Sequence, residues 1–197
     1  VHVMEAYDIR HINVLIVEDN RHMRFLLKTI LQGLGIKSVE EAEDGSDALK
    51  LLQTFPADLI VTDWLMEPLD GIDLIRMIRT GSDTQDAFIP IIMLTGYTEV
   101  ARVQEARDAG VTEFLAKPIS SLALYHRMVQ IIEKPRYFIQ GGRYTGPDRR
   151  RREANFKGED KRSVARESEL PKPRIPMPIQ RVQPAPEPTG SARLFMN

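Results

Sequence analysis

The chain has 197 residues, of which 42% are hydrophobic and 28% are charged, and its formal net charge is −1. Its length permits one sizeable domain and an additional segment. It contains no cysteine, which excludes disulfide frameworks, cysteine zinc sites and thiol nucleophiles.

Short apolar runs bounded by polar residues predict five β-strands in the first two thirds of the chain. The expected strands are residues 12–17, 38–42, 58–62, 90–94 and 111–116. Three of them contain continuously apolar stretches, Val14–Val17, Leu59–Val61 and Ile91–Leu94. Parallel strands that are covered by helices on both faces have this composition.

Longer stretches with apolar residues every three or four positions predict a helix after each strand. The first helix is marked by Met23, Leu26, Leu27, Ile30, Leu31 and Leu34, and it ends at Gly35. The other helices are expected at residues 45–55, 72–79, about 99–109 and 120–133. This alternation predicts an α/β fold, a five-stranded parallel sheet with five helices.

Charge and proline content divide the chain at Lys134. Up to this residue there are 13 Lys and Arg against 21 Asp and Glu, whereas 14 and 7 follow it, together with nine of the 13 prolines. We therefore expect a folded domain over residues 12–134 and a basic, proline-rich, disordered tail over residues 135–197. No apolar run approaches the roughly 20 residues of a membrane span, so we expect a cytoplasmic protein without membrane insertion.

Polar residues directly follow four of the predicted strands. They are Glu18 and Asp19, Asp63, Thr95, and Lys117. Each alone is typical of a helix cap or a turn, but the carboxyl ends of parallel strands meet at one sheet edge, where ligands bind. Oxygen ligands without histidine or cysteine favour Mg²⁺, and a lysine and a hydroxyl suit phosphoryl oxygens. The pattern predicts a magnesium-dependent site in which a carboxylate accepts a phosphoryl group.

Five motifs carry a family resemblance. They are Val17-Glu18-Asp19-Asn20, Val61-Thr62-Asp63-Trp64-Leu65-Met66, Asp70-Gly71, Met93-Leu94-Thr95-Gly96 and Phe114-Leu115-Ala116-Lys117-Pro118. In order and spacing, residues 12–134 resemble the response-regulator receiver domain, also called CheY-like. The resemblance implies a flavodoxin-like, doubly wound sheet with strand order 2-1-3-4-5.

The resemblance also implies roles for the residues at the strand ends. Asp63 is the implied phosphoacceptor, and Asp19 and Asp63 are implied direct Mg²⁺ ligands. The backbone carbonyl of Leu65 would complete the protein's share of the metal shell, and Glu18 would act through a metal-bound water. Lys117 would pair with the phosphoryl group.

The resemblance further implies a conformational switch. Thr95 would hydrogen-bond the phosphoryl group, and Phe114 occupies the aromatic switch position, although an ordinary half-buried strand aromatic remains the alternative. Leu65 and Tyr97 are the side chains best placed to control the water that hydrolyses the phosphoryl group, and neither carries an amide or a carboxylate. Whether the Lys117–Pro118 bond is cis is left open by the sequence.

The implied function is a two-component signalling switch that catalyses only its own phosphorylation and dephosphorylation. A sensor histidine kinase or a histidine phosphotransfer protein would donate the phosphoryl group, and an unidentified downstream protein would respond. One alternative is an aspartate-based phosphatase. Such an enzyme needs an acid/base carboxylate two residues after the nucleophile, where this chain has Leu65.

The tail contains a short repeat, because residues 144–150, YTGPDRR, return as residues 156–162, FKGEDKR. An aromatic residue, a glycine, an acidic residue and a basic pair keep their places. The candidate contact residues are Tyr144, Phe156, Arg149 and Arg150. Three interpretations stay open: a docking motif for a partner protein, a weak nucleic-acid contact that would make the chain a nucleic-acid-binding regulator, and a solvated linker.

Overall fold

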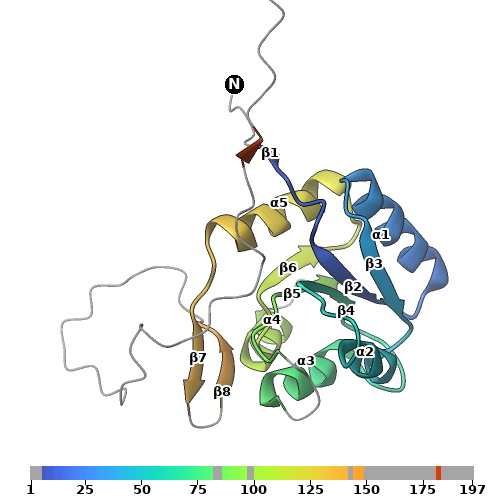
Figure 1. Ribbon diagram of the computed structural model, residues 1–197. Helices are drawn as coiled ribbons and strands as arrows, with labels where there is room; N and C mark the ends of the chain where they lie inside the picture. Colours follow the sequence, from blue (N-terminus) through green and yellow to red (C-terminus); the bar gives the residue numbers. More distant parts are fainter. Residues whose placement is uncertain (1–5, 82–85, 97–99, 142–143, 149–180, 183–197) are drawn as a thin grey trace, which may run out of the picture.

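A computed structural model describes residues 6–81, 86–96, 100–141, 144–148 and 181–182. Five parallel strands form its central sheet in the order β3-β2-β4-β5-β6 (Figure 1). They are β2 (Asn13–Val17), β3 (Ser38–Ala42), β4 (Leu59–Asp63), β5 (Ile91–Thr95) and β6 (Glu113–Ala116). Counted from β2, this is the order 2-1-3-4-5, so the predicted doubly wound sheet is confirmed.

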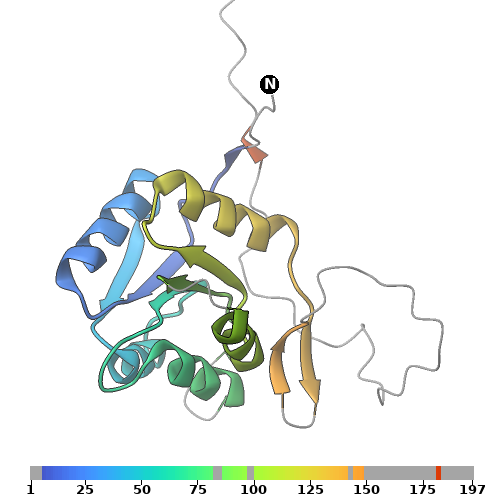
Figure 2. The same ribbon diagram turned by 180° about the vertical axis from the view of Figure 1, so that it is seen from behind.

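Five helices connect and cover these strands. They are α1 (Arg21–Gly33), α2 (Gly45–Leu52), α3 (Gly71–Thr80), α4 (Val100–Ala109) and α5 (Ser121–Glu133). The helices α1 and α5 lie on one face of the sheet, and α2, α3 and α4 lie on the other (Figures 1 and 2). The side chains of Asn20, Asp44, Asp70 and Ser120 accept backbone N–H groups in the first turns of α1, α2, α3 and α5, which fixes where these helices begin.

The two faces of the sheet have separate apolar cores, because successive strand residues point to opposite sides. Leu15 packs in the cluster that also contains Leu74 of α3. Ile16, the next residue, packs in the cluster that contains Leu27 of α1 and Leu124 of α5. The continuously apolar runs of the sequence therefore supply both cores at once.

The chain continues after α5 into an antiparallel hairpin of β7 (Phe138–Gly141) and β8 (Tyr144–Pro147). The prediction of disorder directly after Lys134 is therefore wrong for the described residues up to Asp148. It failed because it required apolar runs, whereas this hairpin is anchored by one buried ring, Phe138, which is 1% exposed. The prediction for residues 149–180 and 183–197 lies outside the described residues.

Two further short strands, β1 (Ala6–Tyr7) and β9 (Arg181–Val182), pair in antiparallel fashion. Within the described part of the chain, no helix has the length and apolar character that crossing a membrane would require.

Candidate functional site

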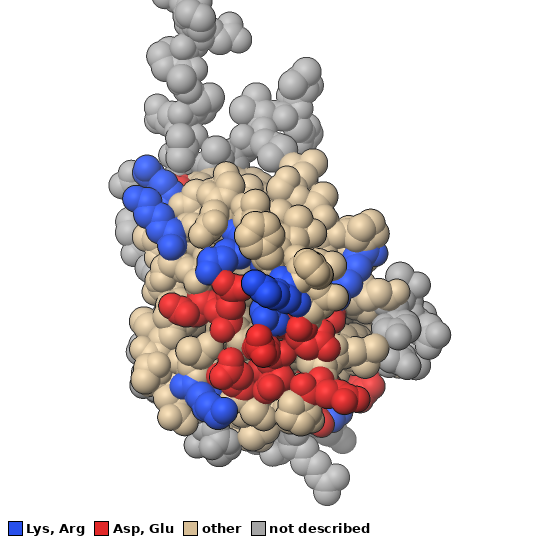
Figure 3. All heavy atoms as spheres, turned by 90° about the vertical axis from the view of Figure 1, so that its right-hand side faces the viewer, with Lys and Arg blue, Asp and Glu red and all other residues tan. Residues whose placement is uncertain are grey.

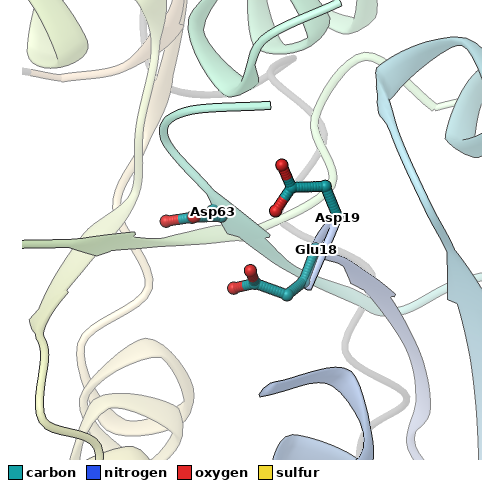
Figure 4. A group of neighbouring side chains, drawn as sticks. All are labelled: Glu18, Asp19 and Asp63. Atoms are coloured by element: carbon teal, nitrogen blue, oxygen red, sulfur yellow. The ribbon is translucent and has the colours of Figure 1, made fainter. Parts of the chain in front are cut away.

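Acidic side chains gather on the face toward which β2 and β3 point. Figure 3 shows this face, with a broad band of Asp and Glu interrupted by a few Lys and Arg. The carboxylates of Glu18, Asp19 and Asp63 each have an oxygen within 4.8 Å of an oxygen of the other two. The three side chains project from the adjacent ends of β2 and β4 into the same region (Figure 4).

Lys117 connects two of these carboxylates. Its Nζ lies 2.9 Å from Oδ2 of Asp63 and donates a hydrogen bond to Oε2 of Glu18 at 3.2 Å. Its backbone N–H donates to the carbonyl of Thr95 at 2.9 Å, which fixes the end of β6 beside the end of β5. The Lys117–Pro118 bond is cis. The structure thus brings together all five residues that the sequence placed at the strand ends.

Burial and like charge shape the electrostatics of the site. Glu18 is 1% exposed, and burial, followed by the neighbouring charge of Asp63, raises the pKa of its carboxyl although Lys117 acts in the opposite direction. Burial alone would lower the pKa of the Lys117 ammonium, but its contacts with Asp63 and Glu18 outweigh that effect and raise it. The lysine therefore stays charged and offsets part of the negative charge.

The loop after β2 is held by Arg24, a buried residue in the first turns of α1. Its Nη1 donates to the carbonyls of Glu18 at 2.7 Å and Asp19 at 3.0 Å, and its Nη2 donates to Oε1 of Glu43 at 2.7 Å. This residue fixes the backbone on which both carboxylates stand. This role is not predictable from the sequence, because an arginine on an amphipathic helix is usually exposed.

The loop after β4 is shaped by a close backbone approach. Oδ1 of Asp63 accepts the backbone N–H of Trp64 at 2.8 Å, which orients the carboxylate. The N–H of Gly71 donates to the carbonyl of Trp64 at 2.9 Å. A Cβ atom on Gly71 would collide with the carbonyl oxygen of Asp63. The glycine of the Asp70-Gly71 motif therefore permits the close contact between the two backbones. Leu65, the residue after Trp64, is 49% exposed.

The donor set fits a hard divalent cation. Three carboxylates lie together, and the cluster contains no histidine or cysteine. Because Mg²⁺ prefers oxygen ligands and retains several waters, it suits a site with few protein ligands and an exposed Asp19.

Some of the other predicted site residues lie in the described part of the chain and some lie outside it. Thr95 is buried, and Phe114 is half-buried and packs against the core on the α3 and α4 side. Tyr144 lies in β8 and contacts its own chain. The other predicted residues, Tyr97, Arg149, Arg150 and Phe156, lie outside the described residues.

Comparisons with known proteins show a similarity to one family. Residues 14–129 match the family described as the response regulator receiver domain. The chemotaxis protein CheY-3 of Vibrio cholerae is 35% identical over 131 residues, which cover 66% of this chain and 99% of that protein. The chemotaxis protein CheY of Pseudomonas aeruginosa is 36% identical over 121 residues, or 61% of this chain and 96% of that protein.

Solved structures show the same similarity. The chemotaxis response regulator CheY4 of Vibrio cholerae has a TM-score of 0.56 at 32% identity, covering 61% of this chain and 98% of that one. The receiver domain of a histidine kinase from Arabidopsis thaliana, solved as a complex with Mg²⁺ and BeF₃⁻, has a TM-score of 0.55 at 28% identity, covering 62% and 91%.

Proposed function

This chain belongs to the response regulator receiver domain family, the receivers of two-component signalling, and we propose that Asp63 is its phosphoryl acceptor. The observation that carries this proposal is the contact of Asp63 with Lys117 beside two further carboxylates, at the meeting point of four strand ends. The phosphoryl donor is a sensor histidine kinase or a histidine phosphotransfer protein.

The transfer requires one oxygen of Asp63 to attack phosphorus. A P–O bond forms as the P–N bond of the donor's phosphohistidine breaks, and the imidazole leaves with a proton. The backbone N–H of Trp64 holds Oδ1, while Oδ2 faces Lys117. The ammonium of Lys117 then pairs with the phosphoryl oxygens, which carry more negative charge than the Asp63 carboxylate carried before transfer.

We assign Mg²⁺ to the acidic cluster. Asp19, Asp63 and the backbone carbonyl of Leu65 are the proposed direct ligands, and Glu18 acts through a bound water. The ion offsets the negative charge of the phosphoryl oxygens. Support comes from the oxygen-only donor set and from the similar Arabidopsis receiver domain that was solved with Mg²⁺ and BeF₃⁻.

Phosphorylation is read out by a shift of conformational population. The hydroxyl of Thr95 bonds the phosphoryl group, and the region from Thr95 to Phe114 changes its arrangement. Phe114 pairs with Met93 of β5 and lies on β6, three residues before Lys117. The face of α4, β6 and α5 then changes its affinity for a downstream protein.

The single tryptophan tests this proposal, because Trp64 is adjacent to the acceptor and its backbone bonds the acceptor carboxylate. Beryllofluoride, a phosphoryl mimic, is titrated into the full chain with Mg²⁺ while Trp64 fluorescence is recorded. We expect a saturable change that requires Mg²⁺ and is absent in Asp63→Asn. A response that is undiminished in Asp63→Asn, or no response in the unmodified chain, would overturn the assignment.

A further inference from the structure

The C-terminal hairpin, described over residues 136–141 and 144–148 with β7 and β8, is docked on the ends of α3 and α4. Figures 1 and 2 show the two strands beside these helices, away from β2 and β3. Its Phe138 is buried and meets Phe88, which precedes β5, edge to face with ring centroids 5.3 Å apart. The hairpin is thus packed against the receiver fold.

Arg79, in the last turn of α3, ties the hairpin to the end of α4. It is 3% exposed, and its guanidinium carbon lies 5.0 Å from the centre of the Phe138 ring. The same guanidinium donates to the carbonyl of Gly110 from Nε at 3.1 Å and from Nη2 at 3.0 Å. Nη1 donates to the carbonyls of Ala87 and Ile89. One buried cation therefore holds both the hairpin ring and the residue that ends α4.

The first copy of the tail repeat makes a second contact with the same place. The hydroxyl of Tyr144 lies 2.8 Å from the carbonyl of Pro147 and 3.4 Å from that of Arg107 in α4. A Cβ atom on Gly146 would lie 2.7 Å from the Tyr144 hydroxyl and 3.1 Å from Cα of Gly110. The aromatic residue of the motif thus contacts α4, and its glycine permits a close approach to Gly110 just beyond α4.

Arg136 makes the third contact, with Thr112, the residue before β6. Its Nη1 donates to the carbonyl of Thr112 at 3.2 Å, and its Nη2 donates to the carbonyl of Asp148. The N–H of Asp148 in turn donates to the carbonyl of Tyr137 at 2.7 Å. All three contacts meet the segment from Arg107 to Thr112, which leads from α4 into β6.

We propose that the C-terminal hairpin is an internal readout of the receiver, which undocks from α4 when Asp63 is phosphorylated. This inference rests on the proposed function, in which the region between Thr95 and Phe114 changes its arrangement. In this structure the hairpin contacts the segment 107–112 while Asp63 is a free carboxylate in contact with Lys117. A displacement of that segment breaks the contacts of Arg79, Tyr144 and Arg136 together.

Hydrogen exchange of the full chain, followed by mass spectrometry with and without Mg²⁺ and beryllofluoride, tests the proposal. Peptides covering residues 136–148 should exchange about fivefold faster or more with the mimic bound. Trp64 fluorescence of the same samples reports binding of the mimic. Unchanged exchange in samples that bind it would overturn the readout and leave the proposed function intact. Failure to bind would overturn both.

Reciprocal coupling gives a second test. If phosphorylation undocks the hairpin, a variant with a weakened hairpin contact should bind beryllofluoride more tightly. Phe138→Ala removes the buried ring and should lower the half-saturating beryllofluoride concentration about fivefold. Tyr137→Ala is the matched control, since that neighbouring ring is 59% exposed. Gly146→Ala, which inserts a Cβ between Tyr144 and Gly110, is the second variant if Phe138→Ala does not fold. Faster exchange of the hairpin without a gain in affinity would contradict the coupling.

Discussion

The ammonium nitrogen of Lys117 lies 2.9 Å from Oδ2 of Asp63, within reach of the same carboxylate that we assign to Mg²⁺ and to the phosphoryl group. Lys117 and the proposed Mg²⁺ would therefore both bring positive charge to one carboxylate. The positive charge of Lys117 should weaken the binding of Mg²⁺. It should strengthen the binding of the phosphoryl group, which is negative.

Replacing Lys117 by methionine should separate these two effects. Removal of the ammonium leaves the carboxylates more negative, so Mg²⁺ should bind at least about threefold more tightly, whereas beryllofluoride should bind much more weakly. Both affinities are measured by titration with Trp64 fluorescence. Lys50→Met, at an exposed position in α2, is the control. Weaker Mg²⁺ binding in Lys117→Met would contradict the opposed roles.

A pair of glycine substitutions tests the close backbone approach at Asp63. Gly71→Ala should lower the free energy of unfolding by about 2 kcal/mol and weaken Mg²⁺ binding, because its Cβ collides with the carbonyl of Asp63. A Cβ atom on Gly33, at the end of α1, would have no neighbouring atom within 4 Å. Gly33→Ala should therefore be neutral or slightly stabilising. Urea unfolding measures both. Equal losses in the two variants would show that the approach at Gly71 is not tight.

The sheet and the site were predictable because their signals are local. A strand buried on both faces must be continuously apolar, and a polar residue directly after it must lie at the sheet edge. Asp63 and Lys117 satisfy this condition and were found by it. The roles of the site residues come from family resemblance and geometry together.

The interactions missed from the sequence have no local signal. Arg24 supports the acidic loop through backbone carbonyls, and Arg79 is buried among four carbonyl contacts and a ring. In the sequence, a buried arginine on a helix cannot be distinguished from an exposed one. Phe138 is one aromatic in a polar segment, and its burial depends on Arg79 and Phe88, which lie some 50 residues or more away in the chain.

Truncation should show that the folded unit includes the C-terminal hairpin. A chain ending at Lys134 should have a lower free energy of unfolding than a chain ending at Asp148, by about 2 kcal/mol, because burial of a ring such as Phe138 contributes about that much. Both truncations lack β9, so the comparison isolates the hairpin. Urea unfolding provides the measurement, and identical midpoints would mean that the docking contributes no stability.

We expect the lifetime of the phosphorylated state to depend on the side chains near the attacking water. Leu65 offers no hydrogen bond to orient it, and Tyr97, outside the described residues, also lacks an amide or carboxylate. We expect the phosphoryl group to persist for many minutes. The Leu65→Asn, Tyr97→Glu double variant should lose it at least about tenfold faster, a barrier difference of about 1.4 kcal/mol. Loss of the phosphoryl group from the unmodified chain within seconds, after removal of the donor, would contradict the expected role of Leu65 and Tyr97.

Intact-mass measurement after incubation with acetyl phosphate and Mg²⁺ tests the central claim most directly. The unmodified chain should gain one phosphoryl group. Asp63→Asn should gain none, and the control Asp73→Asn, at an exposed position in α3, should behave as the unmodified chain does. Labelling of Asp63→Asn to the same extent as the unmodified chain would show that the acceptor is another residue.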